Sequence, residues 1–227
     1  MELILIAGLW LKNTVWDEVV TGLAAKGAKA TALALPGVDD DDHEVTLEQQ
    51  LAAATAAIDA ADSPVTVVGH SAASTLAWLA ADRRPDKVAQ VVLIGGMPGA
   101  NGASYSDFFE PQGNMMPFPG WQPFEGPDAE DLDAGARARL EAQMQPVPVG
   151  VSRGVIRYTD ERRHAVPVVM VCPEYSVEDA QAWLEAGEIP ELQPAELLTF
   201  IDIDSGHWPM ISRPAELTEL LARLATA

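Results

Sequence analysis

Two residues of this sequence, Ser71 and His207, are of the types that together cleave a bond by nucleophilic attack. A serine hydroxyl is a poor nucleophile at neutral pH and needs a base within hydrogen-bond reach. Of the four histidines, His207 is the best placed, because it follows the last apolar segment on a glycine-flanked loop. His43 and His164 lie in loop segments, and strand alternation turns the side chain of His70 away from its neighbour Ser71. We therefore expect Ser71 to be the nucleophile and His207 its general base.

Ser71 stands between a short apolar run, residues 65–69, and the start of an alanine-rich helical segment. A strand that runs directly into a helix needs a sharp turn, and the turn residue is forced into a strained backbone conformation. The residues two positions before and after the turn must be small, and Gly69 and Ala73 meet this need. The first amides of the helix lack intrahelical acceptors, so the N–H of Ala72 can hold an oxyanion.

The motif GHSAA at residues 69–73 resembles the G-x-S-x-G nucleophile elbow of the α/β-hydrolase family, with alanine in place of the last glycine. The segment GHWP at residues 206–209 resembles the histidine loop of the same family. The resemblance covers nearly the whole chain in the order of its elements. It implies a doubly wound, mostly parallel sheet with helices on both faces, a triad in the order serine, acid, histidine, and no cofactor.

The resemblance also suggests the triad acid. In the family, the acid commonly follows the strand that corresponds here to residues 165–171, and the nearest carboxylate to that strand end is Glu174. We therefore assign Glu174 to orient His207, since a triad is defined by geometry rather than by position. The remaining carboxylates near these segments are interpreted as surface groups: Glu178, Asp179 and Asp204.

The turn after the first strand supplies the second oxyanion donor in the family. Here that turn is Gly8-Leu9-Trp10, and the resemblance assigns the donor to the backbone N–H of Leu9. Six residues are expected to line the substrate pocket: Trp10, His70, Met97, Phe118, Trp121 and Trp208.

The 227 residues fit one α/β domain that spans the whole chain. Apolar runs alternating with helical segments predict a parallel sheet. We expect strands at residues 3–7, 28–35, 65–69, 88–94, 165–171 and 197–203, and helices at residues 15–26, 47–61, 72–84, 131–144, 177–186 and 214–224. Thr46 and Ser176 are candidate helix N-caps, and Thr14 with Asp17 matches a capping box.

Residues 99–157 interrupt the rhythm of strands and helices with a stretch rich in proline, glycine, aromatics and methionine. Such a long irregular stretch inside a compact domain is usually functional. We interpret it as a lid excursion over the active-site edge, partly lining an apolar pocket.

The net charge is −20, from 34 acidic and 14 basic residues. This acidic balance disfavours nucleic acid and anionic membranes as partners. The partner that the family resemblance implies is a small-molecule substrate. The acidic run at residues 39–42 lacks the alternating ligands of a metal loop and is interpreted as a solvated surface.

The single cysteine, Cys172, lies in an apolar run and is expected to be a buried thiol. The first apolar run has no basic flank, so we expect a cytoplasmic protein.

These features favour a serine hydrolase acting on small, apolar carboxylic esters. Two alternatives stay open, because a fold does not fix a function. One is a cofactor-free lyase that resembles hydroxynitrile lyases, for which a lid cation would come from Arg153, Arg157, Arg162 or Arg163. The other is a ligand-binding protein that keeps the fold without turnover.

Overall fold

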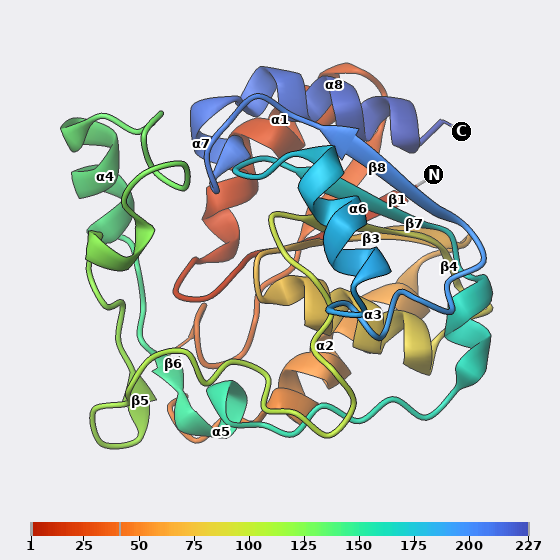
Figure 1. Cartoon of the computed structure of the whole chain (residues 1–227), viewed down its shortest axis with the longest axis horizontal. Coiled ribbons are helices and arrows are strands. Elements are labelled where there is room, and N and C mark those ends of the chain that lie inside the picture. Colours follow the sequence, from red (N-terminus) through yellow and green to blue (C-terminus); the bar gives the residue numbers. More distant parts are fainter. Residues whose placement is uncertain (1, 41, 227) are drawn as a thin grey trace.

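The computed structural model describes residues 2–40 and 42–226, and within them a six-stranded sheet forms the centre of the molecule (Figure 1). All of its strands pair in parallel, in the order β2-β1-β3-β4-β7-β8. The strands are β1 (Glu2–Ile6), β2 (Lys29–Ala32), β3 (Val65–His70), β4 (Val88–Ile94), β7 (Val168–Cys172) and β8 (Leu198–Asp202). The chain winds outward from β1 in one direction and from β3 in the other, so the predicted doubly wound sheet is confirmed.

Helices cover both faces of this sheet. The helices are α1 (Asp17–Ala25), α2 (Leu47–Ala60), α3 (Ala73–Arg83), α4 (Ala134–Glu141), α5 (Val149–Ser152), α6 (Val177–Glu185), α7 (Pro209–Ser212) and α8 (Pro214–Leu224), with short 3-10 helices η1 (Asn13–Trp16), η2 (Gln122–Phe124) and η3 (Glu161–Ala165). The helices α1 and α8 pack on one face, whereas α2, α3 and α6 pack on the other (Figure 1). Within the described residues, no helix has the length and apolar character needed to cross a membrane.

The central strands are mainly apolar because both faces of the sheet are covered. In β1, Leu3 and Leu5 belong to the core beneath α1 and α8, whereas Ile4 and Ile6 belong to the core beneath α2 and α3. Alternate side chains of a strand point to opposite faces, so a continuous apolar run is what a parallel sheet between two helical layers requires.

The helix starts follow local capping chemistry, with one exception. Thr46 and Ser176 both form capping boxes, at the starts of α2 and α6, so these two predictions are confirmed. The predicted capping box of Thr14 with Asp17 is wrong. Thr14 lies inside the 3-10 turn η1, and the N-cap of α1 is Trp16, which has no side-chain capping bond.

Residues 99–157 leave the sheet at the carboxyl ends of its strands and contain the antiparallel pair β5 (Met115–Met116) and β6 (Val147–Pro148) (Figure 1). The two limbs of this excursion are hydrogen-bonded to each other near the sheet. The N–H of Gly102 donates to the carbonyl of Ile156 at 2.9 Å, and the N–H of Tyr105 donates to the carbonyl of Gly154 at 2.8 Å. The excursion therefore has a paired stem close to the sheet and an irregular outer part.

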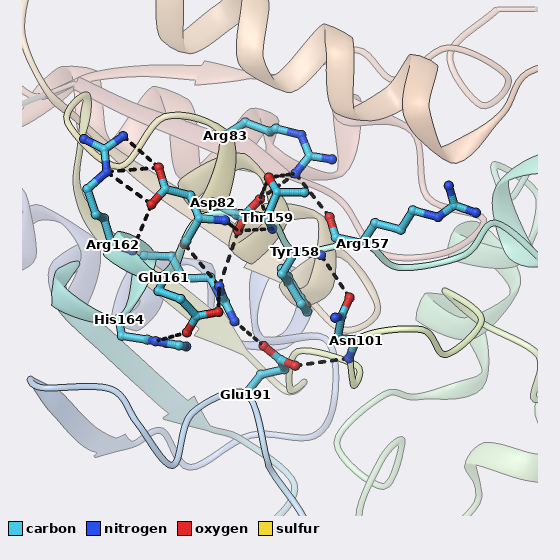
Figure 2. Close-up of polar contacts among 12 residues, drawn as sticks. Asp82, Arg83, Asn101, Arg157, Tyr158, Thr159, Glu161, Arg162, His164 and Glu191 are labelled. Carbon is cyan, nitrogen blue, oxygen red and sulfur yellow. Dashed lines mark hydrogen bonds and ion pairs between the residues drawn. The ribbon is translucent and has the colours of Figure 1, made fainter.

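A buried polar network ties this stem to the far end of α3 (Figure 2). The fully buried carboxylate of Asp82 accepts from the N–H of Thr159 at 2.8 Å and pairs with Arg163 at 3.5 Å. Arg163 also pairs with Glu191 at 3.1 Å, and Glu191 accepts from the N–H of Asn101 at 3.1 Å. Both limbs of the excursion are thus held from the amino edge of the sheet, opposite Ser71.

Candidate active site

Ser71 occupies a strained turn between β3 and α3. Its φ is +55°, a left-handed conformation that is rare outside glycine. The backbones before and after the turn lie so close that a Cβ on Gly69 would be 2.3 Å from the carbonyl oxygen of Ala73. The N–H of Ser71 donates to the carbonyl of Ile94 at 2.8 Å, which fixes the turn to β4. The sharp turn expected from the sequence is therefore present, at the carboxyl edge of the sheet.

His207 and Glu174 meet at the same edge. Nδ1 of His207 donates to Oε1 of Glu174 at 2.6 Å, and both side chains are largely buried. His207 follows β8, whereas Glu174 follows the neighbouring strand β7. A histidine that donates through Nδ1 keeps Nε2 unprotonated, which is the form that accepts a proton from a nucleophile.

The other acidic candidates lie away from the imidazole. Asp179 accepts from Ser176 in the capping box of α6, and Glu178 and Asp204 are exposed. Glu174 is therefore the sequence candidate that contacts His207.

The dipeptide Gly95-Gly96, at the end of β4, touches both parts of the site. A Cβ on Gly95 would lie 3.2 Å from Oε2 of Glu174 and 3.3 Å from Nδ1 of His207. A Cβ on Gly96 would lie 2.2 Å from the carbonyl oxygen of Ser71. Within the described residues, Oγ of Ser71 makes no hydrogen bond, but a nucleophile and its base often reach bonding distance only when substrate is bound.

The backbone of His207 is held on both sides. Its N–H donates to the carbonyl of Asp128 at 2.7 Å, and Nε2 of His70 donates to its carbonyl at 2.7 Å. The preceding residue, Gly206, donates its N–H to Oδ2 of Asp131 at 2.7 Å, and a Cβ on Gly206 would lie 2.3 Å from the carbonyl oxygen of Asp128. The excursion thus contacts the histidine loop directly.

Sequence reasoning did not identify Asp128 or Asp131, because nothing in the irregular excursion shows where it folds back. The one available signal was the glycine before His207, a residue type that permits close backbone approach.

Burial sets the charge state of the groups behind the site. Desolvation, assisted by the nearby His207, lowers the pKa of His70 to about 3, so His70 is neutral and its Nε2–H is the donor to the histidine loop. Partial burial raises the pKa of Asp128. Cys172 is a free, fully buried thiol, as expected, and burial raises its pKa to about 12.

The two predicted oxyanion donors lie in the turns around Ser71. The N–H groups of Leu9 and Ala72 have no backbone acceptor within the part of the chain that the structure describes. Gly8 packs against the nucleophile, since a Cβ on it would lie 3.0 Å from Cβ of Ser71. Trp10, in the same turn, has a φ of +64°, and such strained residues cluster at functional sites. The role of these amides remains a prediction.

A cleft of about 380 Å³ opens beside Ser71. Its walls come from the start of α3, the glycine-rich turn after β4 and the first limb of the excursion. They are formed by Ser71, Ala72, Thr75, Gly95, Gly96, Met97, Gly99, Ala103, Ser104, Tyr105, Asp107 and Phe108. The lining of the cleft is mainly apolar, and one of its residues, Phe108, is 75% exposed.

Of the six residues expected in the substrate pocket, Met97 lines this cleft. Four others form a row of aromatic contacts that ends at His207. The ring centroids are 5.3 Å apart for Trp10 and Phe118, Phe118 and Trp121, and Trp121 and Trp208, and 4.9 Å apart for Trp208 and His207. His70 is buried behind the histidine loop. Contact of these residues with substrate remains a prediction.

Of the four arginines considered for a lyase site, only Arg153 contacts a residue of the cleft within the described part of the chain. Arg162 and Arg163 belong to the network at the far end of α3 (Figure 2). Arg157 is exposed. Arg153 donates to the carbonyl of Phe109 and lies 3.9 Å from a carboxylate oxygen of Asp107, a cleft residue.

Two carboxylates of the acidic run at residues 39–42 accept hydrogen bonds from nearby backbone N–H groups. Asp39 accepts from the N–H groups of Asn13 and Leu35, and Asp40 accepts from the N–H of Gly37, which lowers the pKa of Asp40. Asp41 lies outside the described residues. Across residues 2–40 and 42–226, no cluster of three or more His, Cys, Asp or Glu side chains is arranged to hold a metal ion.

Comparison with known proteins identifies the family. The sequence profile described as the alpha/beta hydrolase family matches residues 3–220, so the chain belongs to the α/β-hydrolase family. No curated protein matches the sequence.

Solved structures share the fold at low sequence identity. An extracellular α/β-hydrolase from a Paenibacillus species, described as structurally and functionally homologous to tobacco salicylic acid binding protein 2, is 18% identical, with a TM-score of 0.78 and 98% of each chain covered. A pyrethroid hydrolase from Sphingobium faniae is 19% identical, with a TM-score of 0.73 over 100% of this chain and 98% of its own. A methylesterase from Arabidopsis is 18% identical, with a TM-score of 0.74 over 100% of this chain and 99% of its own.

Proposed function

We propose that this protein is a serine hydrolase that cleaves small, apolar carboxylic esters through an acyl-enzyme on Ser71. The observation that carries the proposal is the 2.6 Å contact between His207 and Glu174, at the sheet edge where Ser71 stands in its strained turn. Three elements far apart in the sequence supply a nucleophile, a base and an orienting acid at one edge, which is the arrangement that acyl transfer needs.

The proposed reaction runs in two halves. Oγ of Ser71 attacks the ester carbonyl while Nε2 of His207 takes its proton, and the N–H groups of Leu9 and Ala72 stabilise the negative oxygen. The carboxylate of Glu174 stabilises the imidazolium, which then protonates the departing alcohol. Water, deprotonated by the same imidazole, attacks the acyl-enzyme and releases the acid. No cofactor takes part in these steps.

The substrate class is supported by the cleft and by the structural relatives. Met97 and the exposed Phe108 give the cleft apolar contacts suited to a small hydrocarbon group. Among the structural relatives, one is named a pyrethroid hydrolase and another a methylesterase. Their low identity shows only the shared fold, so the ester specificity of this chain is part of the proposal.

Labelling with a fluorophosphonate tests the nucleophile. We expect one covalent adduct on Ser71, detected by mass spectrometry of the intact protein and of its peptides, and none in the Ser71→Ala variant. Ser74→Ala is the matched control, because Ser74 lies three residues later in α3 and its buried hydroxyl donates to the carbonyl of Gly69. A wild-type protein that remains unlabelled, with a folded circular dichroism spectrum, would contradict the proposal.

Hydrolysis of p-nitrophenyl esters of two to eight carbons tests the substrate class. We expect the highest kcat/KM at short to medium chain length, and a loss of at least about 1,000-fold in Ser71→Ala. Equal rates for Ser71→Ala and wild type would favour the non-catalytic alternative.

A further inference from the structure

The hydroxyl of Tyr105, a residue of the same cleft as Ser71, makes no hydrogen bond to the described part of the protein. Tyr105 lies in the first limb of the excursion and forms part of the cleft wall with Thr75. Only 6% of Tyr105 is exposed, yet among the described residues its hydroxyl has no hydrogen-bond partner. Its oxygen is also not one of the fully enclosed polar atoms, so part of the remaining exposure of this residue belongs to the hydroxyl. Buried tyrosine hydroxyls normally have a partner.

Two neighbouring hydroxyls, of Tyr158 and Thr75, are bonded to protein groups, whereas those of Ser106 and Ser152 have no partner among the described residues but are fully enclosed. The hydroxyl of Tyr158 donates to the carbonyl of Gly99 at 3.0 Å, and Oγ1 of Thr75 accepts from the N–H of Gly99 at 2.9 Å. These two bonds fix the part of the cleft wall that Gly99 forms. Tyr105 differs from these four residues because its hydroxyl has no partner among the described residues and is not fully enclosed.

The charge around the cleft limits what this molecule can be. Burial raises the pKa of Tyr105, so the phenol stays protonated and can donate. The side chain of Asp107, also in the cleft wall, is 58% exposed and lies 3.9 Å from Arg153, and a carboxylate in the wall disfavours an anionic acceptor. A neutral oxygen is therefore the acceptor that fits both residues.

We propose that Tyr105 determines specificity by donating a hydrogen bond to a second, neutral oxygen of the substrate, a ketone or ether oxygen distant from the ester bond that is cleaved. The preferred substrates are then oxygenated esters rather than simple alkyl esters. The cleavage of these esters rests on the proposed function, whereas the hydrogen bond from Tyr105 to the bound molecule does not depend on it. An unpaired polar group in a buried site discriminates against a ligand that cannot pair with it.

Two pairs of esters of equal chain length test the proposal. Methyl 5-oxohexanoate and methyl hexanoate differ by one oxygen on the acyl side. 2-Ethoxyethyl acetate and pentyl acetate differ by one oxygen on the alcohol side. Acid release measured in a pH-stat gives kcat and KM for each ester, and we expect wild type to prefer the oxygenated member of at least one pair.

The Tyr105→Phe variant removes the hydroxyl and keeps the ring. We expect the preference of kcat/KM for the oxygenated ester to fall about five- to tenfold, mainly through KM, since the hydrogen bond is made in the ground state as well. The matched control is Tyr158→Phe, the same change just beyond the excursion at a hydroxyl bonded to protein. It should lower the melting temperature and leave the preference of wild type unchanged.

The binding event can be measured without turnover. In Ser71→Ala and in the double variant Ser71→Ala/Tyr105→Phe, isothermal calorimetry with the same four esters gives their affinities. A preference for the oxygenated ester that Tyr105→Phe abolishes supports the proposal even if wild type hydrolyses none of the esters, in which case the proposed function alone fails.

The proposal is overturned if wild type shows no preference in either pair, or if Tyr105→Phe affects both members of a pair equally. The second result would mean that the hydroxyl faces the cavity of about 10 Å³ that Tyr105 also borders beside Gly8 and Leu9. That cavity has room for a single water molecule at most.

Discussion

Replacing Glu174 by glutamine tests the catalytic arrangement most directly. The change keeps the size of the side chain but removes the charge that faces Nδ1 of His207 at 2.6 Å. At this distance, and with an effective dielectric constant of about 20, a carboxylate and an imidazolium attract each other by about 6 kcal/mol. The imidazolium exists only during proton transfer, so this stabilisation is lost from the transition state rather than from the bound substrate.

We therefore expect Glu174→Gln to lower kcat by about 1,000- to 10,000-fold, with little change in KM. Initial rates with p-nitrophenyl butanoate measure the effect, and the melting temperature shows whether the variant is folded. Glu178→Gln serves as a control, because it removes the same charge from an exposed position in α6. A loss of less than tenfold in Glu174→Gln, with normal folding, would show that Glu174 does not orient the base.

Three further predictions concern the surroundings of the site. Gly206→Ala would place a Cβ 2.3 Å from the carbonyl oxygen of Asp128 and so displace the histidine loop. We expect kcat to fall at least about 100-fold while the circular dichroism spectrum stays that of a folded protein; an unchanged kcat contradicts this. Because His70 is buried with a pKa of about 3, the unfolded chain binds more protons below pH 6.5, and wild type should lose about 2 kcal/mol of unfolding free energy between pH 7 and pH 5 in urea titrations. His70→Gln should remove most of that slope, and an equal slope in both proteins refutes the assignment. Asp82→Asn leaves Arg163 buried without its full counter-charge and should destabilise the fold by about 3–5 kcal/mol, seen as a lower melting temperature, whereas a change below about 1 kcal/mol contradicts the network.

The sheet and its covering helices were predictable because local patterns report burial on both faces. All six predicted strands of the sheet are present, and their shifts in boundary have local causes. Strand β7 begins at Val168 rather than at residue 165, because residues 161–165 form the 3-10 helix η3. The helix expected at residues 131–144 begins only at Ala134, because the side chain of Asp133 accepts from the N–H of Ala136 and caps it there.

The site was predictable where turn chemistry carries the signal and not where tertiary packing does. Ser71 and His207 stand in short turns whose small neighbours are visible in the sequence, and Glu174 came from the order of elements in the family. In contrast, the contacts of Asp128, Asp131 and Tyr105 depend on how the irregular excursion returns to the sheet. No periodicity within residues 99–157 encodes that path, so their positions required the structure.

The paired stem of the excursion has a consequence for how a molecule can enter the cleft. Residues 102–105 and 154–156 are hydrogen-bonded to each other, and the neighbouring backbone is tied through Asp82 to the end of α3 remote from Ser71. An opening movement that began at this base would have to break the ladder and expose a buried carboxylate. We therefore expect an opening movement to occur in the outer turns, where a Cβ on Gly113 would have no atom within 4 Å. Insertions or new chain ends placed in these outer turns should change access to the cleft while the residues beside Ser71 keep their positions.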